Sequence, residues 1–387
     1  MNNLTPFKFR FHPVRFSFFF VILLIISVGC HKANIENKSL RDFQQINLVA
    51  NSAAYSPVLI DPTLHNAWGL AWAPSGIAWV NSMSGHISEL YTGEGAIVRP
   101  PVNIPSPTDT IGGLPTGIVF AGGAGFTLSN NQAPNFLFAG VDGVVSGWNG
   151  TAGNNALRIA NNSATSAYTG LALAIWNGSH FLYAANFRAG KIDVWDTTFS
   201  AVSMPFHDPA LPSGYSPFNI QSVGNWLFVE YAKPAPDGRS QAGAGLGLVD
   251  VFNPDGSFVR RFASRGTLNA PWGIVITPAN FLQSLDMSDD GDGPKVGNNG
   301  NGNKDNDDLD QPPVILVGNF GDGRINVYST QGQFMGQLQS HNRTIVIDGL
   351  WALSFAPTTS TIDQKRLYFT AGPAAETDGL FGYLIKN

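Results

Sequence analysis

Short apolar runs separated by glycine and proline follow one another along the chain, and two of them recur in alternation. The first motif is an apolar strand centred on glycine, such as WGLAW at 68–72. Its six copies are centred on positions 69, 117, 170, 219, 273 and 352, so they are spaced 48, 53, 49, 54 and 79 residues apart. Self-similarity at a period of about fifty residues is typical of a repeat architecture.

The second motif is a turn glycine followed by a strand of alternating polarity, such as GKIDVW at 190–195. Its six copies begin at positions 85, 143, 190, 247, 323 and 379. Between the two motifs, every copy has a third apolar run (77–80, 136–138, 181–184, 226–229, 314–317 and 367–369). Three strands and a weaker outer one in about fifty residues match one blade of a propeller. The pattern predicts an all-β fold, a six-bladed β-propeller.

The ends of such a ring must be joined. Residues 46–50 (INLVA) precede the first blade and have no partner of their own. We expect them to form the outer strand of the last blade beside residues 380–385, which removes an open sheet edge. The predicted propeller spans residues 45–387. It contains an insertion at about 286–311, rich in Asp, Asn and Gly, which we expect to be disordered.

The first thirty residues have the pattern of an export signal. Lys8, Arg10 and Arg15 form a basic segment, and an apolar run follows at 16–28. That run ends in SVGC at 27–30, which resembles the bacterial lipobox. The resemblance implies a lipoprotein signal peptide at 1–29, lipid attachment at Cys30 and a polar tether at 30–44. The alternative is a plain cleavable signal with an incidental cysteine. The lipoprotein interpretation places the protein in the cell envelope, at the outer membrane or cell surface, with the membrane as a partner.

Charge argues against one class of partner. Without residues 1–29, which hold three of the 22 basic residues, the net charge is −8. Residues 286–310 contribute eight Asp and two Lys to that total, so the remaining body is close to neutral. A nucleic-acid partner would require a basic face, so none is expected.

The strand patterns resemble those of NHL/TolB-like six-bladed propellers. More closely, the chain resembles a family of uncharacterised bacterial β-propeller proteins. The resemblance rests on NLV at 47–49, NAWGL at 66–70, LPTG at 114–117 and GNFGDGRI at 318–325. It implies the fold and no established activity, because function depends on sites and not on folds.

Local signatures of catalysis are missing from the sequence. It contains no G-x-S-x-G, H-E-x-x-H, Walker or G-x-G-x-x-G pattern in the required context. The histidines that follow the signal segment are not spaced as a metal-binding pair. We therefore list no catalytic residue.

Two groups of oxygen-bearing side chains are candidates for calcium. Asn81, Asn186, Glu230 and Asn319 follow the second strand of blades one, three, four and five, where they would line the channel. The structural alternative is that such side chains bond to the following turn. The second group is Asp289, Asp290 and Asp292 in the insertion, which does not have EF-hand spacing.

The loops that precede the first motif should meet at one mouth of the propeller axis. Their aromatic and polar residues make the best candidate for a ligand or partner face. The candidates are His65, Asn66, Thr116, Tyr168, Pro217, Trp272 and Trp351. For Trp68, Trp272 and Trp351 the favoured interpretation is packing between blades.

These observations predict an exported, lipid-anchored propeller that acts as a non-enzymatic binding or scaffold module for a protein or glycan partner. The alternative is a calcium-dependent hydrolase of the lactonase or esterase type, with the metal in the axial channel. Calcium is the cofactor that this alternative requires.

Overall fold

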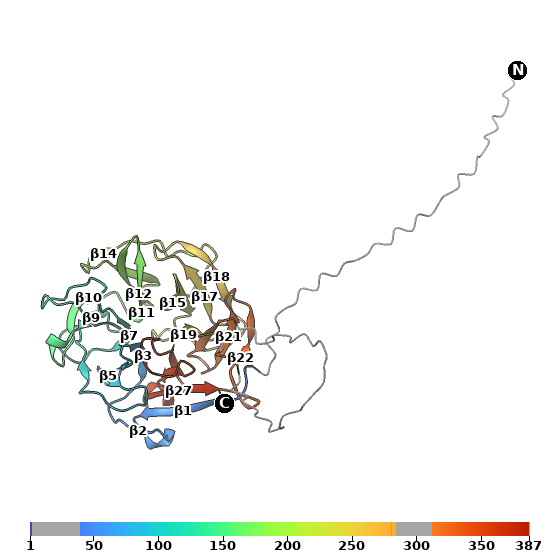
Figure 1. Cartoon of the computed structure of the whole chain (residues 1–387). Coiled ribbons are helices and arrows are strands. Elements are labelled where there is room, and N and C mark those ends of the chain that lie inside the picture. The colour runs from blue at the N-terminus through green and yellow to red at the C-terminus, as the bar shows by residue number, and fades with distance from the viewer. Residues whose placement is uncertain (2–38, 280, 284–311, 387) are drawn as a thin grey trace, which may run out of the picture. The chain divides into compact units, whose positions relative to one another are not determined.

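The computed structural model describes Met1 and residues 39–279, 281–283 and 312–386. Six β-sheets lie around a common axis, as Figure 1 shows, so the predicted six-bladed propeller is confirmed. Each blade contains the three predicted strands in order, followed by an outer strand. The fourth copy of the first motif, which has Asn219 at its centre instead of glycine, also forms an inner strand, β15, which pairs with β16.

The first five blades are formed by consecutive strands. Blade 1 consists of β3 (Ala67–Trp72), β4 (Ala78–Ser82), β5 (Ile87–Tyr91) and β6 (Val102–Asn103). Blade 2 consists of β7 (Pro115–Phe120), β8 (Phe136–Gly140), β9 (Val144–Trp148) and β10 (Leu157–Asn161). Blade 3 consists of β11 (Tyr168–Trp176), β12 (Ser179–Asn186), β13 (Lys191–Trp195) and β14 (Ala201–Val202). Blade 4 consists of β15 (Ser216–Val223), β16 (Trp226–Ala232), β17 (Leu248–Phe252) and β18 (Phe258–Ser264). Blade 5 consists of β19 (Pro271–Ile276), β20 (Val314–Asn319), β21 (Ile325–Ser329) and β22 (Phe334–Gln337).

Blade 6 joins the two ends of the described chain. It contains β25 (Leu350–Ser354), β26 (Leu367–Ala371), β27 (Leu380–Lys386) and then β1 (Phe43–Ala50), with the short β2 (Leu59–Ile60) outside them. β1 runs antiparallel to β27, with Ile46 opposite Tyr383. This confirms the predicted closure, in which the last blade takes its outer strand from the start of the domain.

The remaining elements are short. They are η1 (Ala53–Tyr55), η2 (Gly150–Ala152), α1 (Pro373–Glu376), and the hairpin of β23 (Gln339–Ser340) and β24 (Arg343–Thr344). Within the described ranges, no helix is long and apolar enough to cross a membrane.

The folded body begins earlier than the predicted boundary at residue 45. β1 starts at Phe43, and Leu40 and Phe43 are each only 1% exposed in the core between blades 5 and 6. Two apolar side chains near the end of the expected tether are thus packed, as their hydrophobicity favours. Cys30, residues 2–29 of the signal segment and the whole insertion, including Asp289, Asp290 and Asp292, lie outside the described residues.

Glycine in the first motif lets neighbouring inner strands approach near the axis. A Cβ atom on Gly69 would lie 2.1 Å from the carbonyl oxygen of Thr116 in the next blade, and one on Gly273 would lie 2.5 Å from that of Trp351. The neighbouring atoms are backbone, which cannot move aside without moving a strand. The mechanical reason for these glycines is therefore the convergence of the blades.

Candidate functional site

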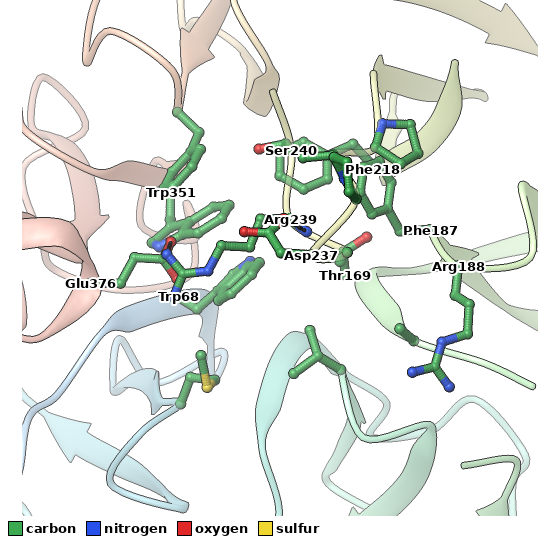
Figure 2. Close-up of a pocket in the computed structure, with 18 residues that line it drawn as sticks. Trp68, Thr169, Phe187, Arg188, Phe218, Asp237, Arg239, Ser240, Trp351 and Glu376 are labelled. Atoms are coloured by element: carbon green, nitrogen blue, oxygen red, sulfur yellow. Dashed lines mark hydrogen bonds and ion pairs between the residues drawn. The ribbon is translucent and has the colours of Figure 1, made fainter. Parts of the chain in front are cut away.

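A cavity of about 410 Å³ opens at one mouth of the propeller axis. All six blades contribute to it, because its wall includes residues from the start of inner strands and from the loops between second and third strands. Its lining includes Trp68, Val141, Thr169, Phe218, Phe320 and Trp351, one from each blade. Figure 2 shows the arrangement. We call this space the mouth cavity.

Stacked aromatic rings form one wall of the mouth cavity. The rings of Trp68 and Trp351 stack with centroids 3.6 Å apart, and Phe320 stacks on the other side of Trp351 at 3.9 Å. Trp68 is 4% exposed and Trp351 is 1% exposed. The expected packing of the tryptophans is therefore seen, but it joins blades 1, 5 and 6 at the axis and also shapes the cavity wall.

An ion pair crosses the mouth between two blades that are not neighbours. Arg239 lies in the β16–β17 loop of blade 4, and its Nη1 is 3.3 Å from Oε1 of Glu376 in blade 6. Figure 2 shows Arg239 reaching Glu376 on the side of the cavity where Trp68 and Trp351 lie. The pair connects two loops that are longer than the corresponding loop of blade 3.

Asn66 connects the aromatic wall to this ion pair. Trp351 Nε1 donates to Asn66 Oδ1 at 2.8 Å, and Asn66 Nδ2 donates to Glu376 Oε2 at 3.0 Å. Asn66 is fully buried and has a φ of 47°, a left-handed conformation that asparagine tolerates better than most residues. A Cβ on Gly372 would lie 2.1 Å from Asn66 Oδ1, so this glycine makes room for the amide.

The Glu376 carboxyl is partly withdrawn from water. Burial raises its pKa, and the charge of Arg239 and the hydrogen bond from Asn66 oppose that rise. Glu376 also has a φ of 70°, and the two preceding residues, Ala374 and Ala375, have φ values of 54° and 55°. Three successive non-glycine residues in the left-handed region are strained, and such strain tends to occur at functional sites.

Of the seven residues predicted for the partner face, only Trp351 lines the mouth cavity directly. Asn66 and His65 lie behind the wall. His65 Nδ1 is 3.0 Å from the carbonyl oxygen of Thr377, so it supports the loop that carries Glu376. Asn66 thus acts on the cavity through Trp351 and Glu376, and His65 acts on it through the loop that contains Glu376.

The other four predicted residues do not reach the mouth cavity. Thr116 is fully buried and its hydroxyl donates to the carbonyl oxygens of Ala139 and Tyr168. The hydroxyl of Tyr168 is 3.2 Å from Asp193. Pro217 is buried, and Trp272 faces a cavity at the opposite end of the axis. Being next to the first motif was not enough to place a side chain in the mouth.

The four channel candidates for calcium have different hydrogen-bond surroundings. Asn81 Nδ2 donates to the carbonyl oxygen of Thr116, and Asn186 Oδ1 accepts from the backbone nitrogen of Ala189 in the following turn. Asn319 donates to Asp322 in its own turn. Asn186 and Asn319 thus make the turn contacts of the structural alternative. The described ranges contain no group of three or more His, Cys, Asp or Glu side chains that could hold a metal.

Glu230 differs from the three asparagines. It is fully buried, and neither carboxyl oxygen has a hydrogen-bond partner among the described residues. Burial raises the pKa of its carboxyl well above the usual range.

Two further concave regions lie at the opposite end of the inner strands or near it. One, of about 310 Å³, is lined by residues of the repeated first motif, among them Gly69, Gly117 and Trp272. The other is a groove between blades 3 and 4 that contains Trp176 and Trp226, which are 36% and 49% exposed. We call the first the opposite cavity and the second the tryptophan groove.

Sequence reasoning missed Arg239, Asp237 and Glu376. Arg239 and Asp237 lie in the long β16–β17 loop, and Glu376 lies in the β26–β27 loop. The available signal was length: these loops occupy 233–247 and 372–379, whereas the corresponding loop of blade 3 occupies only 187–190. Unusually long connections often carry function.

Comparison with known proteins identifies two close relatives in Acanthamoeba polyphaga mimivirus. Uncharacterized protein L690 is 34% identical over 289 residues, which cover 70% of this chain and 68% of L690. Uncharacterized protein R648 is 30% identical over 359 residues, covering 89% of this chain and 80% of R648. These relatives are viral, so the bacterial origin implied by the sequence resemblance stays a prediction. No family model matches the chain.

Among solved structures, streptogramin B lyase is similar with a TM-score of 0.48 and 11% identity, covering 89% of this chain and 97% of the lyase. The propeller assignment itself rests on the sheet order of this chain.

Proposed function

This chain belongs to the same protein family as the mimivirus proteins L690 and R648, and we propose that it is a non-enzymatic module that binds a protein partner at the mouth cavity. The observation that carries the proposal is the shape and lining of that cavity, to which all six blades contribute. Concave sites with apolar walls and a few placed polar groups are the usual form of a binding site.

The chemistry of the lining favours binding over turnover. Asp237 and Glu376 are the acidic residues among the described residues of the wall, and Glu376 is engaged by Asn66 and Arg239. General acid–base catalysis needs proton-transfer groups that are available to the substrate. The charged groups of Asp237, Arg239 and Glu376 are instead arranged as a polar rim beside an aromatic wall, which suits the anchoring side chain of a partner.

A pair of tryptophan substitutions tests the proposal. Ala167 is half-buried in the wall of the mouth cavity, and Ala71 is half-buried in the wall of the opposite cavity. Peptides selected from a displayed library on the purified full chain should bind the Ala71→Trp variant and lose binding to the Ala167→Trp variant. Thermal melts establish that both variants fold. Selected peptides that bind both variants equally would place the partner site elsewhere and contradict the proposal.

A glycan is the second candidate partner, and the tryptophan groove favours it. Trp176 and Trp226 expose ring surface in one groove, together with His180 and Asn225, which are able to hydrogen-bond sugar hydroxyls. Binding on a glycan array that is lost in Trp226→Ala and kept in Ala167→Trp would support this site. Binding that is unchanged in Trp226→Ala would argue against it.

We also propose that the module is held at a membrane by lipid on Cys30, in the cell envelope. The support is the basic and apolar segment followed by SVGC at 27–30. Mass spectrometry of the mature N-terminal peptide should find acyl chains on Cys30, and Cys30→Ser should move the protein from the membrane fraction to the soluble fraction. An unmodified Cys30 would overturn the anchor without affecting the proposal for the mouth cavity.

A further inference from the structure

The two members of the ion pair at the mouth differ in how firmly they are held. The Glu376 side chain is 14% exposed, whereas that of Arg239 is 62% exposed. Glu376 accepts a hydrogen bond from buried Asn66, and Asn66 is fixed in turn by Trp351. The carboxylate is therefore the preorganised half of the pair.

The backbone around Glu376 strengthens this asymmetry. Its left-handed turn is fastened by hydrogen bonds from Ala374 N to Asp348 Oδ2 at 3.0 Å and from Thr377 Oγ1 to the carbonyl oxygen of Ala374 at 2.8 Å. A turn of this hand is unfavourable for residues other than glycine, and so it persists only where the surroundings hold it. The strained turn orients the Glu376 carboxylate towards the cavity.

Arg239, in contrast, lies at the tip of a hairpin. The backbone of Ala235 donates to the carbonyl oxygen of Arg239 at 2.7 Å, and Gly238 at the turn has a φ of 83°. The guanidinium reaches Glu376 across the mouth with most of its side chain in water. Because the Arg239 side chain is mostly solvated already, a competing cation that takes its place on Glu376 displaces it at small cost.

We propose that the mouth cavity recognises a guanidinium or primary ammonium group, which displaces Arg239 and binds Glu376 beside the wall of Trp68 and Trp351. This deepens the proposed function and rests on it. A carboxylate accepts two parallel hydrogen bonds from a guanidinium. Arg239 then acts as an internal competitor, which pairs with Glu376 until the cation of the partner displaces it.

The charges of the lining favour a cation over an anion. An anion entering the cavity would meet Glu376 and Asp237, whereas Arg188 is on the far side from Glu376, as Figure 2 shows, and donates to the carbonyl oxygen of Ser163 at 3.2 Å. Among the described residues of the lining, the basic group beside Glu376 is the exposed Arg239 itself. The fixed part of the site is therefore acidic and aromatic.

Calorimetric titration of the full chain with N-acetyl-arginine amide tests this inference, with the uncharged N-acetyl-citrulline amide as the comparison ligand. We expect binding of the arginine ligand alone. Arg239→Gln should tighten that binding about tenfold, because it removes the internal competitor. Glu376→Gln, which keeps an acceptor for Asn66, should abolish it.

Lys191→Gln is the matched control. Its side chain is also 62% exposed and pairs with an acid, Asp193, away from the mouth cavity. We expect no change in affinity for this variant. Since burial raises the pKa of Glu376, acidification should also weaken cation binding in the wild-type protein, a readout that needs no substitution.

Equal binding of the citrulline ligand, unchanged affinity in Glu376→Gln, or weaker binding in Arg239→Gln would each overturn the inference. Agmatine and an arginine-containing peptide separate the sources of the cation, because a peptide that binds more tightly than agmatine identifies a protein side chain. If selected peptides lose binding in Ala167→Trp but do not depend on a cationic residue, this inference fails and the proposed function stands.

Discussion

The two ends of the propeller axis are built from different parts of the chain. The opposite cavity is lined by the first motif itself, with Gly69 and Gly117 among its residues. The mouth cavity takes Asp237, Arg239 and Glu376 from the β16–β17 and β26–β27 loops, which are longer than the corresponding loop of blade 3. The opposite cavity is thus formed by strands that every blade repeats, whereas the mouth cavity also contains residues of two long loops.

This difference separates structural constraint from candidate function. Near the opposite cavity, backbone atoms of neighbouring blades approach so closely that a methyl group does not fit at Gly69. At the mouth, buried polar groups and a left-handed turn direct Glu376 into an open space. Substitutions at the first end should act mainly on stability, and those at the second mainly on binding.

The largest effect on stability is expected for Gly69→Ala. The added Cβ would lie 2.1 Å from the carbonyl oxygen of Thr116, so a strand must shift, which costs about 3 kcal/mol of unfolding free energy. Gly150→Ala is the control, because a Cβ there meets nothing within 4 Å. Chemical denaturation measures both. Equal stability of the two variants would show that inner-strand convergence does not limit the residue at position 69.

The sequence was sufficient to predict the fold because the fold repeats. Six copies of the first motif reveal both the number of blades and their order, and the two copies without the central glycine, at Asn219 and Ala352, still form inner strands. Closure by residues 46–50 was predictable because an unpaired strand at one end needs a partner at the other.

The site was less predictable because it is built from exceptions to the repeat. Trp351 and Asn66 were identified from their position before an inner strand, but Thr116 and Tyr168 occupy the same kind of position and turn their hydroxyls to neighbouring backbone and side-chain groups instead. Glu376 and Arg239 are distant in sequence and belong to no motif. Their meeting depends on the angle between blades 4 and 6, which a local pattern does not contain.

A second buried carboxyl lies on β16 of blade 4, away from the ion pair at the mouth. Glu230 is paired in the sheet with Asn219, which lines the opposite cavity, and burial raises its pKa well above the usual range. The native state thus retains a proton that the unfolded chain releases. This contribution to stability is full below the pKa of an unfolded carboxyl, about 4, and is lost as the pH rises through the raised pKa.

We therefore expect the unfolding free energy of the wild-type protein to fall between about pH 5 and about pH 8. It should fall less in Glu230→Gln, and the two decreases should differ by on the order of 1 kcal/mol. Glu89 and Asp250, whose pKa values burial raises to about 7, act in the same direction and remain in the variant. Glu94→Gln serves as the control because the Glu94 side chain is 70% exposed. Denaturation curves at the two pH values measure the slopes; equal slopes in wild type and Glu230→Gln would contradict a protonated Glu230.

The smallest effect concerns the strained turn at the mouth, and its sign is unusual. Ala375 is exposed with a φ of 55°, so Ala375→Gly should raise the unfolding free energy by about 0.5 kcal/mol by relieving strain. Ala54 is exposed in η1 and has an ordinary negative φ, so Ala54→Gly should instead lower it by about 0.5 kcal/mol. If the strain serves to hold Glu376, Ala375→Gly should also weaken cation binding, because the carboxylate is less firmly positioned. A variant that is more stable and binds as tightly as the wild type would show that the left-handed turn does not contribute to recognition.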